Sequence, residues 1–102
     1  MSITTERSGD GSELTIRIEG RFDFSSHQAF RHAYEGEGQG ISQYVIDMRD
    51  TTYLDSSALG MLLLLRDYAG GEKADVRIVN CNGDVRRILT VSNFEQLFQI
   101  DD

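Results

Sequence analysis

The run Asp55-Ser56-Ser57 carries the side chains best suited to chemistry in this chain, because it places two hydroxyls and a carboxylate directly before an apolar helical segment. Each of the three can cap a helix by accepting a hydrogen bond from a free N–H of the first turn. One cap is enough for one helix, and Asp47 and Asp50 lie just upstream. Capping nevertheless explains most clusters of this kind, so the residues alone leave a structural role and a special chemical role both open.

The other reactive side chains do not form a recognisable site. His27 and His32 are five residues apart on a short predicted helix, so they face different directions, and no third ligand stands at a useful spacing. We therefore expect no metal site. Cys81 is the single cysteine and cannot form an intramolecular disulfide. At the end of a predicted strand, a small thiol of this kind is best explained as a core residue.

The sequence also lacks the motifs of common enzymes. A serine hydrolase would need glycine two places before and after Ser56, but Leu54 and Ala58 stand there. The glycines at positions 36, 38 and 40 are not followed by a Lys-Ser pair, so they do not form a phosphate-binding loop, and no kinase catalytic loop is present. We predict a protein that is not an enzyme, with no catalytic residues and no cofactor.

Composition narrows the class of partner. The 102 residues suffice for one domain, which we place at residues 1–102, with little room for a deep substrate cavity. The net charge of −7 argues against nucleic acid or anionic lipid as the main partner and favours proteins. The longest apolar run is far shorter than the ~20 residues that span a bilayer. The first residues show no basic start or apolar run for export, so we expect a cytoplasmic protein without membrane insertion.

Two strands are predicted before the first helix. Leu14, Ile16 and Ile18 alternate with polar residues, which indicates a half-buried strand, and residues 3–7 form a hairpin partner across Gly9-Asp10-Gly11. Ser25 and Gln28 have the spacing of a capping box, which predicts a short helix through Tyr34 that stops at Gly36.

The rest of the chain alternates strands and helices. Residues 44–48 and 76–79 are β-rich and are separated by a helical pattern, as in a parallel βαβ unit. A further helix follows Asn82, and we expect the tail to close the core with Phe94, Leu97, Phe98 and Ile100. The predicted order is β, β, α, β, α, β, α, with room for a short final strand. Right-handed crossovers then bring the carboxyl ends of the parallel strands to one edge.

The long helix after Ser56 has apolar residues on more than one side. On a helical wheel, most of the apolar residues share one face, which is the expected core face. Leu59 and Leu63 point away from that face and lie beside Arg66. The expected core residues are Ala58, Met61, Leu62, Leu65, Tyr68 and Ala69. Leu59 and Leu63 could be buried against a neighbouring helix or form a docking stripe beside Ser56, and both explanations stay open.

Two segments resemble a known signature. Val45-Ile46-Asp47-Met48 followed by residues 54–60, Leu-Asp-Ser-Ser-Ala-Leu-Gly, resembles the motif of STAS-domain anti-sigma factor antagonists, with Ala58 in place of the commoner glycine. Gly20-Arg21-Phe22-Asp23 is similar to the strand-to-helix loop of that family, and residues 79–98 are similar to its last strand and helix. The resemblance implies an α/β STAS fold, with a mixed four- to five-stranded sheet and helices packed against it.

The resemblance also implies a regulatory function. In that bacterial family an anti-sigma factor with serine kinase activity phosphorylates a serine of this motif, and the unphosphorylated antagonist captures the anti-sigma factor, so that a sigma factor is released for transcription. A phosphoserine phosphatase reverses the step. The serine after the aspartate corresponds to Ser56, which makes it the phosphoacceptor. Ser57 then becomes the helix cap, Asp55 and Asp23 frame the acceptor, and Leu59, Gly60 and Leu63 are the candidate docking residues.

Elementary electrostatics suits such a switch. A helix N-terminus tolerates an added anion, and a phosphoserine brings about −1.5 to −2 charge. One like-charge contact at about 4 Å costs about 4 kcal/mol at an effective dielectric of about 20, which is roughly a thousandfold in affinity. A partner with an acidic face at this point would be expelled without refolding.

A structural role is the alternative. Small cytoplasmic STAS subunits of lipid-transport ABC systems resemble this fold and bind a nucleotide-binding subunit. Such a subunit needs a docking face but no phosphorylation switch, so the presence or absence of phosphorylation separates the two hypotheses.

Overall fold

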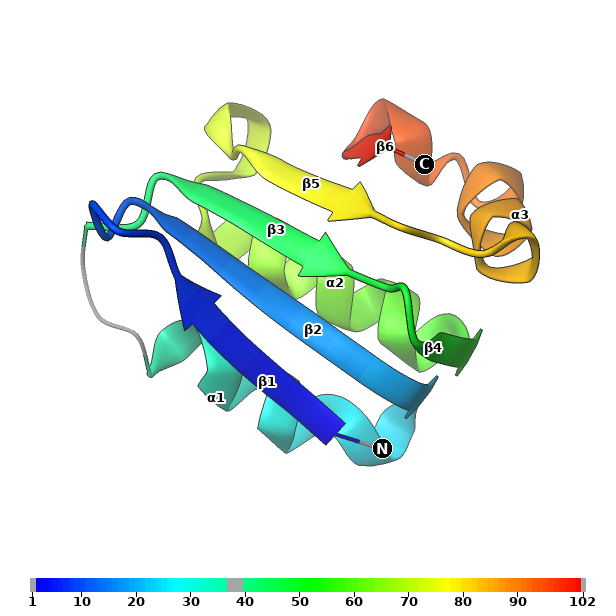
Figure 1. Ribbon diagram of the computed structural model, residues 1–102. Coiled ribbons are helices and arrows are strands. Elements are labelled where there is room, and N and C mark those ends of the chain that lie inside the picture. The colour runs from blue at the N-terminus through cyan, green and yellow to red at the C-terminus, as the bar shows by residue number, and fades with distance from the viewer. Residues whose placement is uncertain (1, 37–39, 102) are drawn as a thin grey trace.

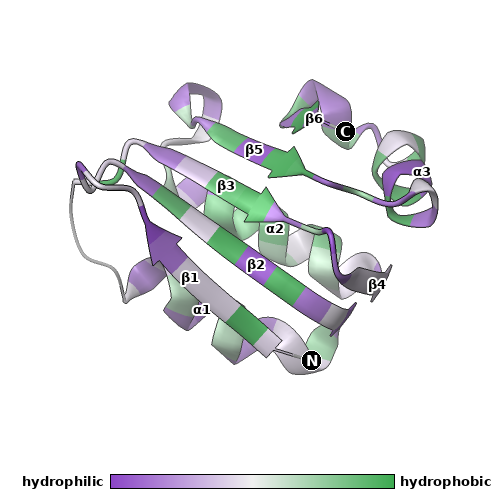
Figure 2. Ribbon diagram, in the orientation of Figure 1, coloured by the Kyte–Doolittle hydropathy of each residue, from purple (hydrophilic) through white to green (hydrophobic). Residues whose placement is uncertain are grey.

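The computed structural model describes residues 2–36 and 40–101, which form a mixed sheet with helices packed on one face (Figure 1). Its organising strand is β2, Glu13–Phe22. Leu14, Ile16 and Ile18 are at most 1% exposed, and Figure 2 shows hydrophobic and hydrophilic residues alternating along this strand. β1, Ser2–Arg7, pairs antiparallel with β2. The predicted hairpin is therefore confirmed.

The other strands lie parallel to β2. β3, Gln43–Asp47, pairs with β2; β5, Val76–Val79, pairs with β3; and β6, Gln99–Asp101, pairs with β5. The strand order is β1-β2-β3-β5-β6. This arrangement confirms the predicted parallel unit and the short final strand.

One strand was not predicted. β4, Thr51–Leu54, pairs parallel with the last residues of β2, which brings the sheet to six strands. β2 has 10 residues and β3 only 5, so β2 continues past the end of β3 and its edge is left open for a second partner. The buried Thr51 hydroxyl donates to the Ile18 carbonyl at 2.8 Å and holds β4 in place. The segment 20–23, expected as a loop, is strand as far as Phe22.

Helices α1, His27–Glu35, and α2, Ser56–Tyr68, cover the same face of the sheet (Figure 1). Phe30, Leu62 and Leu65 are at most 1% exposed and belong to one core with the inward side chains of the strands. α1 ends at the Gly36 C-cap, as predicted. Its predicted capping box, Ser25 with Gln28, was wrong: Asp23 and Ser26 form a box two residues earlier, around the 3₁₀ turn η1, Phe24–Ser26.

The C-terminal part closes the core at one edge. It contains the 3₁₀ turn η2, Gly71–Lys73, the helix α3, Gly83–Val91, and the 3₁₀ turn η3, Phe94–Gln96. Phe94 and Phe98 are buried as expected, with ring centroids 5.5 Å apart. Leu97 is 40% exposed, so its assignment to the core was wrong. Tyr68 was also wrongly assigned to the core: it is the last residue of α2 and is 49% exposed, with its ring packed edge-on against Tyr34.

Asn82 ties α3 to β4. Its Oδ1 accepts a hydrogen bond from the Val85 N–H at 2.9 Å and so caps α3, while its Nδ2 donates to the Thr51 carbonyl at 2.9 Å. One side chain thus fixes both the start of α3 and its position against the short strand.

We predict that Asn82→Ala lowers the free energy of unfolding by about 2 kcal/mol, because it removes a helix cap and a part-buried hydrogen bond. Asn82→Ser retains a capping oxygen and loses only the bond to Thr51, so it should cost about 1 kcal/mol. Urea denaturation of both variants checks this. Equal losses for the two variants would show that the cap contributes nothing, and an unchanged stability of Asn82→Ser would show the same for the bond to Thr51.

Candidate functional site

The candidate site lies where β2 and β4 end side by side. Phe22 pairs with Leu54 in the parallel register, so the next residues, Asp23 and Asp55, leave the sheet at the same edge. α2 begins immediately afterwards with Ser56. The unpredicted strand β4 is therefore what brings two of the predicted site residues, distant in sequence, to one edge of the sheet.

The cap of α2 is Asp55. Its backbone is extended (φ −113°, ψ −176°), and its Oδ1 accepts a hydrogen bond from the Ala58 N–H at 2.9 Å. The assignment of Ser57 as the cap was wrong, because Ser57 already lies inside the helix, whereas a cap residue needs non-helical backbone. Of the two serines, Ser56 is exposed and Ser57 half-buried.

The Ser56 hydroxyl is available for chemistry. It makes no hydrogen bond to any residue in the described ranges 2–36 and 40–101, and it lies in the first turn of α2. The unused N–H groups and the positive end of the helix dipole favour an anion at such a position. Asp55 uses one of its carboxylate oxygens for the cap, so an exposed hydroxyl and a fixed carboxylate lie next to each other.

Asp23 has a structural task at the same edge. It accepts hydrogen bonds from the Ser25 hydroxyl at 2.6 Å and the Ser25 N–H at 3.0 Å, and it pairs with the Arg21 guanidinium at 3.4 Å. The hydrogen bond from the Ser25 hydroxyl, foremost, holds the pKa of Asp23 below its ordinary value. Asp23 is thus a stable anion that fixes the turn η1 beside the site.

The outer side of α2 carries two of the three predicted docking residues. Ser56, Gly60 and Leu63 follow one another at helical spacing, on the side opposite the buried residues Ala58, Met61, Leu62 and Leu65. Leu63 is 37% exposed, and a Cβ on Gly60 would meet no atom of the described residues within 4 Å beyond its own helix backbone and chain neighbours. Leu59 is different, because it is half-buried and packs against the core.

Sequence reasoning missed three exposed side chains at this edge. Phe24 is 76% exposed and Tyr53 40% exposed, and the Arg21 guanidinium lies 4.1 Å from the centroid of the Tyr53 ring. The signal for Phe24 was its place in a polar turn, directly after Asp23, where an aromatic ring has no core to enter. Tyr53 could not be placed without the pairing of β4 with β2.

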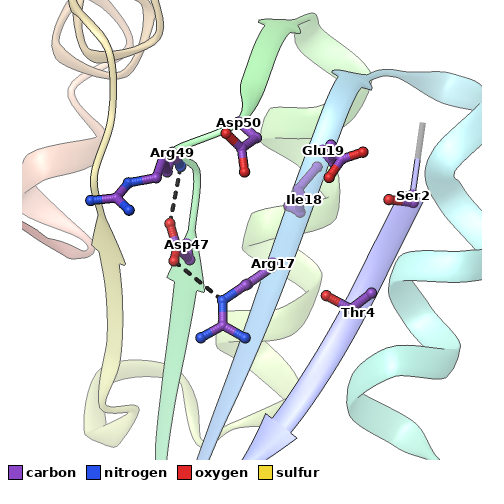
Figure 3. A pocket seen from close by; sticks show the side chains of 8 residues that line it. All are labelled: Ser2, Thr4, Arg17, Ile18, Glu19, Asp47, Arg49 and Asp50. Atoms are coloured by element: carbon purple, nitrogen blue, oxygen red, sulfur yellow. Dashed lines mark hydrogen bonds and ion pairs between the residues drawn. The ribbon is translucent and has the colours of Figure 1, made fainter.

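The two histidines singled out in the sequence lie on α1 rather than at the start of α2. His27 and His32 are exposed on α1, and no group of three metal-binding side chains occurs among residues 2–36 and 40–101. A polar recess of about 240 Å³ lies on the helix-free face of the sheet (Figure 3). Asp47 there accepts from the Arg49 N–H at 3.0 Å and pairs with Arg17 at 3.6 Å, so its charge is compensated. Within the described part of the chain, no helix is long and apolar enough to cross a membrane.

We predict that Asp55→Ala lowers the free energy of unfolding by about 1 kcal/mol, the usual loss for a helix cap. Ser57→Ala should change the free energy of unfolding by less than about 0.5 kcal/mol, because the Ser57 side chain makes no cap bond and alanine is favourable inside a helix. Thermal and urea unfolding of the two variants, with Asp55→Asn as the variant that can still cap, decide between them. A larger loss for Ser57→Ala would contradict the assignment.

This chain matches known proteins along almost its whole length. A family model described as "Mlab, STAS domain" matches residues 5–99. A STAS-domain containing protein of Pseudomonas aeruginosa is 62% identical over 100 residues, which cover 98% of this chain and 99% of that protein.

Solved structures agree on the fold. The STAS domain of an anti-sigma factor antagonist from Rhodobacter sphaeroides is 32% identical, with a TM-score of 0.58 over 78% of this chain and 85% of that one. A candidate anti-sigma factor antagonist from Thermotoga maritima has a TM-score of 0.84 over 98% and 86% of the chains at 17% identity. The Bacillus cell fate determinant SpoIIAA in its phosphorylated form has a TM-score of 0.66 over 97% and 90% at 14% identity.

The same fold also serves other proteins. A sulfate transporter family protein from Wolinella succinogenes has a TM-score of 0.74 over 86% of this chain and 75% of that one, at 14% identity. Fold similarity at this level therefore does not select one function. The fold is that of SpoIIAA-like STAS domains, with six strands where four to five were expected. Since the family model spans almost all of its residues, this chain belongs to the STAS domain family.

Proposed function

We propose that this chain is an anti-sigma factor antagonist whose binding is controlled at Ser56. The unphosphorylated form captures an anti-sigma factor that has serine kinase activity and so frees a sigma factor. Phosphorylation of Ser56 ends the capture, and a phosphoserine phosphatase restores it. The observation that carries this proposal is the exposed Ser56 hydroxyl, which has no hydrogen-bond partner among the described residues, in the first turn of α2.

The local geometry favours Ser56 over Ser57 as the acceptor. A kinase must place the hydroxyl against the γ-phosphate of its nucleotide, so the acceptor oxygen has to be accessible. Ser56 is exposed and Ser57 is half-buried. After transfer, the unpaired N–H groups of the first turn and the helix dipole accommodate the phosphate, so the domain stays folded. The chain supplies the hydroxyl and the partner supplies the catalysis.

Repulsion would then end the complex. The phosphate adds about −1.5 to −2 charge to the side of α2 that also presents Gly60 and Leu63. One contact of this charge with a carboxylate of a docked partner, at about 4 Å, costs about 4 kcal/mol at an effective dielectric of about 20. That is roughly a thousandfold in affinity. The anti-sigma factor antagonist from Rhodobacter sphaeroides, 32% identical to this chain, supports the same class of function.

We predict that Ser56→Ala binds the anti-sigma partner as tightly as the wild type and that Ser56→Asp binds it about 10- to 100-fold more weakly, because aspartate carries less charge than phosphoserine. Calorimetric titration measures the affinities.

Phosphosite mapping after incubation with the partner and ATP should find Ser56, and Ser57→Ala is the matched control. Phosphate on Ser57, or equal affinities for all variants, contradicts the proposal. Purification with a transporter ATPase and no phosphorylated fraction would favour the lipid-transport alternative.

We predict opposite effects of Gly60→Ala on folding and on binding. Alanine in a helix interior is about 1 kcal/mol more favourable than glycine, and the new methyl would not clash with any part of the chain that the structure describes, so the variant should unfold at higher urea. Gly60 lies on the outer side of α2 with Ser56 and Leu63, so the added methyl should prevent close approach of a docked partner and weaken binding about tenfold. Unchanged binding in a stabilised variant would remove Gly60 from the docking surface.

A further inference from the structure

Three exposed side chains, those of Arg21, Phe24 and Tyr53, come from residues at or directly after the ends of β2 and β4. Arg21 pairs with Tyr53 in the strand register, and its guanidinium lies 4.1 Å from the centroid of the tyrosine ring. Phe24 follows in η1 and is 76% exposed, more than any other large hydrophobic side chain of the described residues. We call these three residues the Arg21 cluster. Neither its aromatic rings nor its cation is explained by the core.

The fold fixes the backbone turn that carries Phe24 and orients the guanidinium of Arg21. Asp23 accepts two hydrogen bonds from Ser25, and the Ser26 hydroxyl accepts from the Asp23 N–H at 3.2 Å, so the turn that carries Phe24 is closed at both ends. Arg21 is oriented from two sides, by Asp23 at 3.4 Å and by the Tyr53 ring. Rigid exposed aromatic and arginine side chains lose little entropy on binding, and such residues dominate the energy of protein interfaces.

The guanidinium retains hydrogen-bonding capacity. Its Nε donates to Asp23, and its terminal nitrogens make no hydrogen bond or ion pair to any residue within 2–36 and 40–101. The Arg21 side chain is 63% exposed. An arginine presents five N–H donors in a planar fork that fits a carboxylate. The group that best completes it is a carboxylate, next to an apolar surface that accepts the Phe24 ring.

We propose that the Arg21 cluster binds an acidic segment of the protein partner, with a carboxylate on Arg21 and an apolar recess around Phe24. This inference rests on the proposed function, because it assigns the cluster to the partner that responds to Ser56. Tyr53 and Ser56 are three residues apart, so their Cα atoms lie within about 11 Å, close to the screening length at physiological salt. Because the Arg21 guanidinium lies over the Tyr53 ring, this proposal places the carboxylate bound by Arg21 within the electrostatic reach of a phosphate on Ser56.

The probe for the test is one defined protein. Ser56→Ala and Ser56→Asp are each incubated with an extract of the cells that make this chain. The probe is the protein that Ser56→Ala retains and Ser56→Asp does not, and it is purified for titration. Arg21→Gln and Phe24→Ala should each bind it at least tenfold more weakly. The matched controls, Arg87→Gln and Val91→Ala, alter an exposed cation and a 75% exposed apolar side chain on α3 and should bind within twofold of the wild type.

Salt dependence separates the two contributions. Affinity of the wild type and of Phe24→Ala should fall as salt rises, and this slope should be smaller for Arg21→Gln, because one charge pair is lost. Thermal midpoints identify any variant that has lost its fold. Wild-type affinity of both cluster variants beside a weakened Ser56→Asp would overturn this inference and leave the proposed function standing. Equal retention by Ser56→Ala and Ser56→Asp would overturn the proposed function itself, and this inference with it.

Discussion

The pairing of β2 with three other strands is the constraint on which the rest of the molecule depends. β2 has β1 along one edge, and on the other edge it has β3 for its first half and β4 for its end. Its inward residues Leu14, Ile16 and Ile18 are almost completely buried, so the strand cannot shift by one residue without exposing them. This fixed register sets the point at which β2 and β4 end.

The chemistry at the edge follows from that register. Since Phe22 lies opposite Leu54, the chain leaves both strands at the same level, and Asp23 and Asp55 each become the cap of the next helical element. Both carboxylates are used by the backbone. The Ser56 hydroxyl, in contrast, makes no hydrogen bond to any residue that the structure describes. Under the proposed function, a charge added there would cost the domain little and a bound partner much, as a switch between two complexes requires.

The two faces of the sheet have different physical characters. One is covered by α1 and α2 and holds the core. The other is helix-free and polar, and ion pairs cross its strands: Arg17 pairs with Asp47 (Figure 3) and also with Glu6. Two exposed apolar side chains lie elsewhere: Phe24 directly after the end of β2 and Leu63 on α2. We therefore look for partner binding at that edge rather than on the open sheet.

The sequence by itself determined the main elements and the position of the candidate phosphoacceptor at the start of α2. The alternation of Leu14, Ile16 and Ile18 and the run Asp55-Ser56-Ser57 are local signals, because side-chain period and helix starts depend on neighbours in the chain. Which of the three polar residues caps α2 was decided by the backbone angles, and these follow from the direction in which β4 enters the helix.

Other features needed the tertiary structure. β4 has four residues, too few for a clear periodic signal, and it is a strand because the longer β2 offers it an open edge. A helical wheel shows in which direction Leu59, Leu63 and Tyr68 point, but not which segment covers each direction. Leu59 meets the core, Tyr68 meets Tyr34 at the surface, and Leu63 stays exposed. Burial depends on contacts between segments distant in the chain, and only the folded structure specifies those contacts.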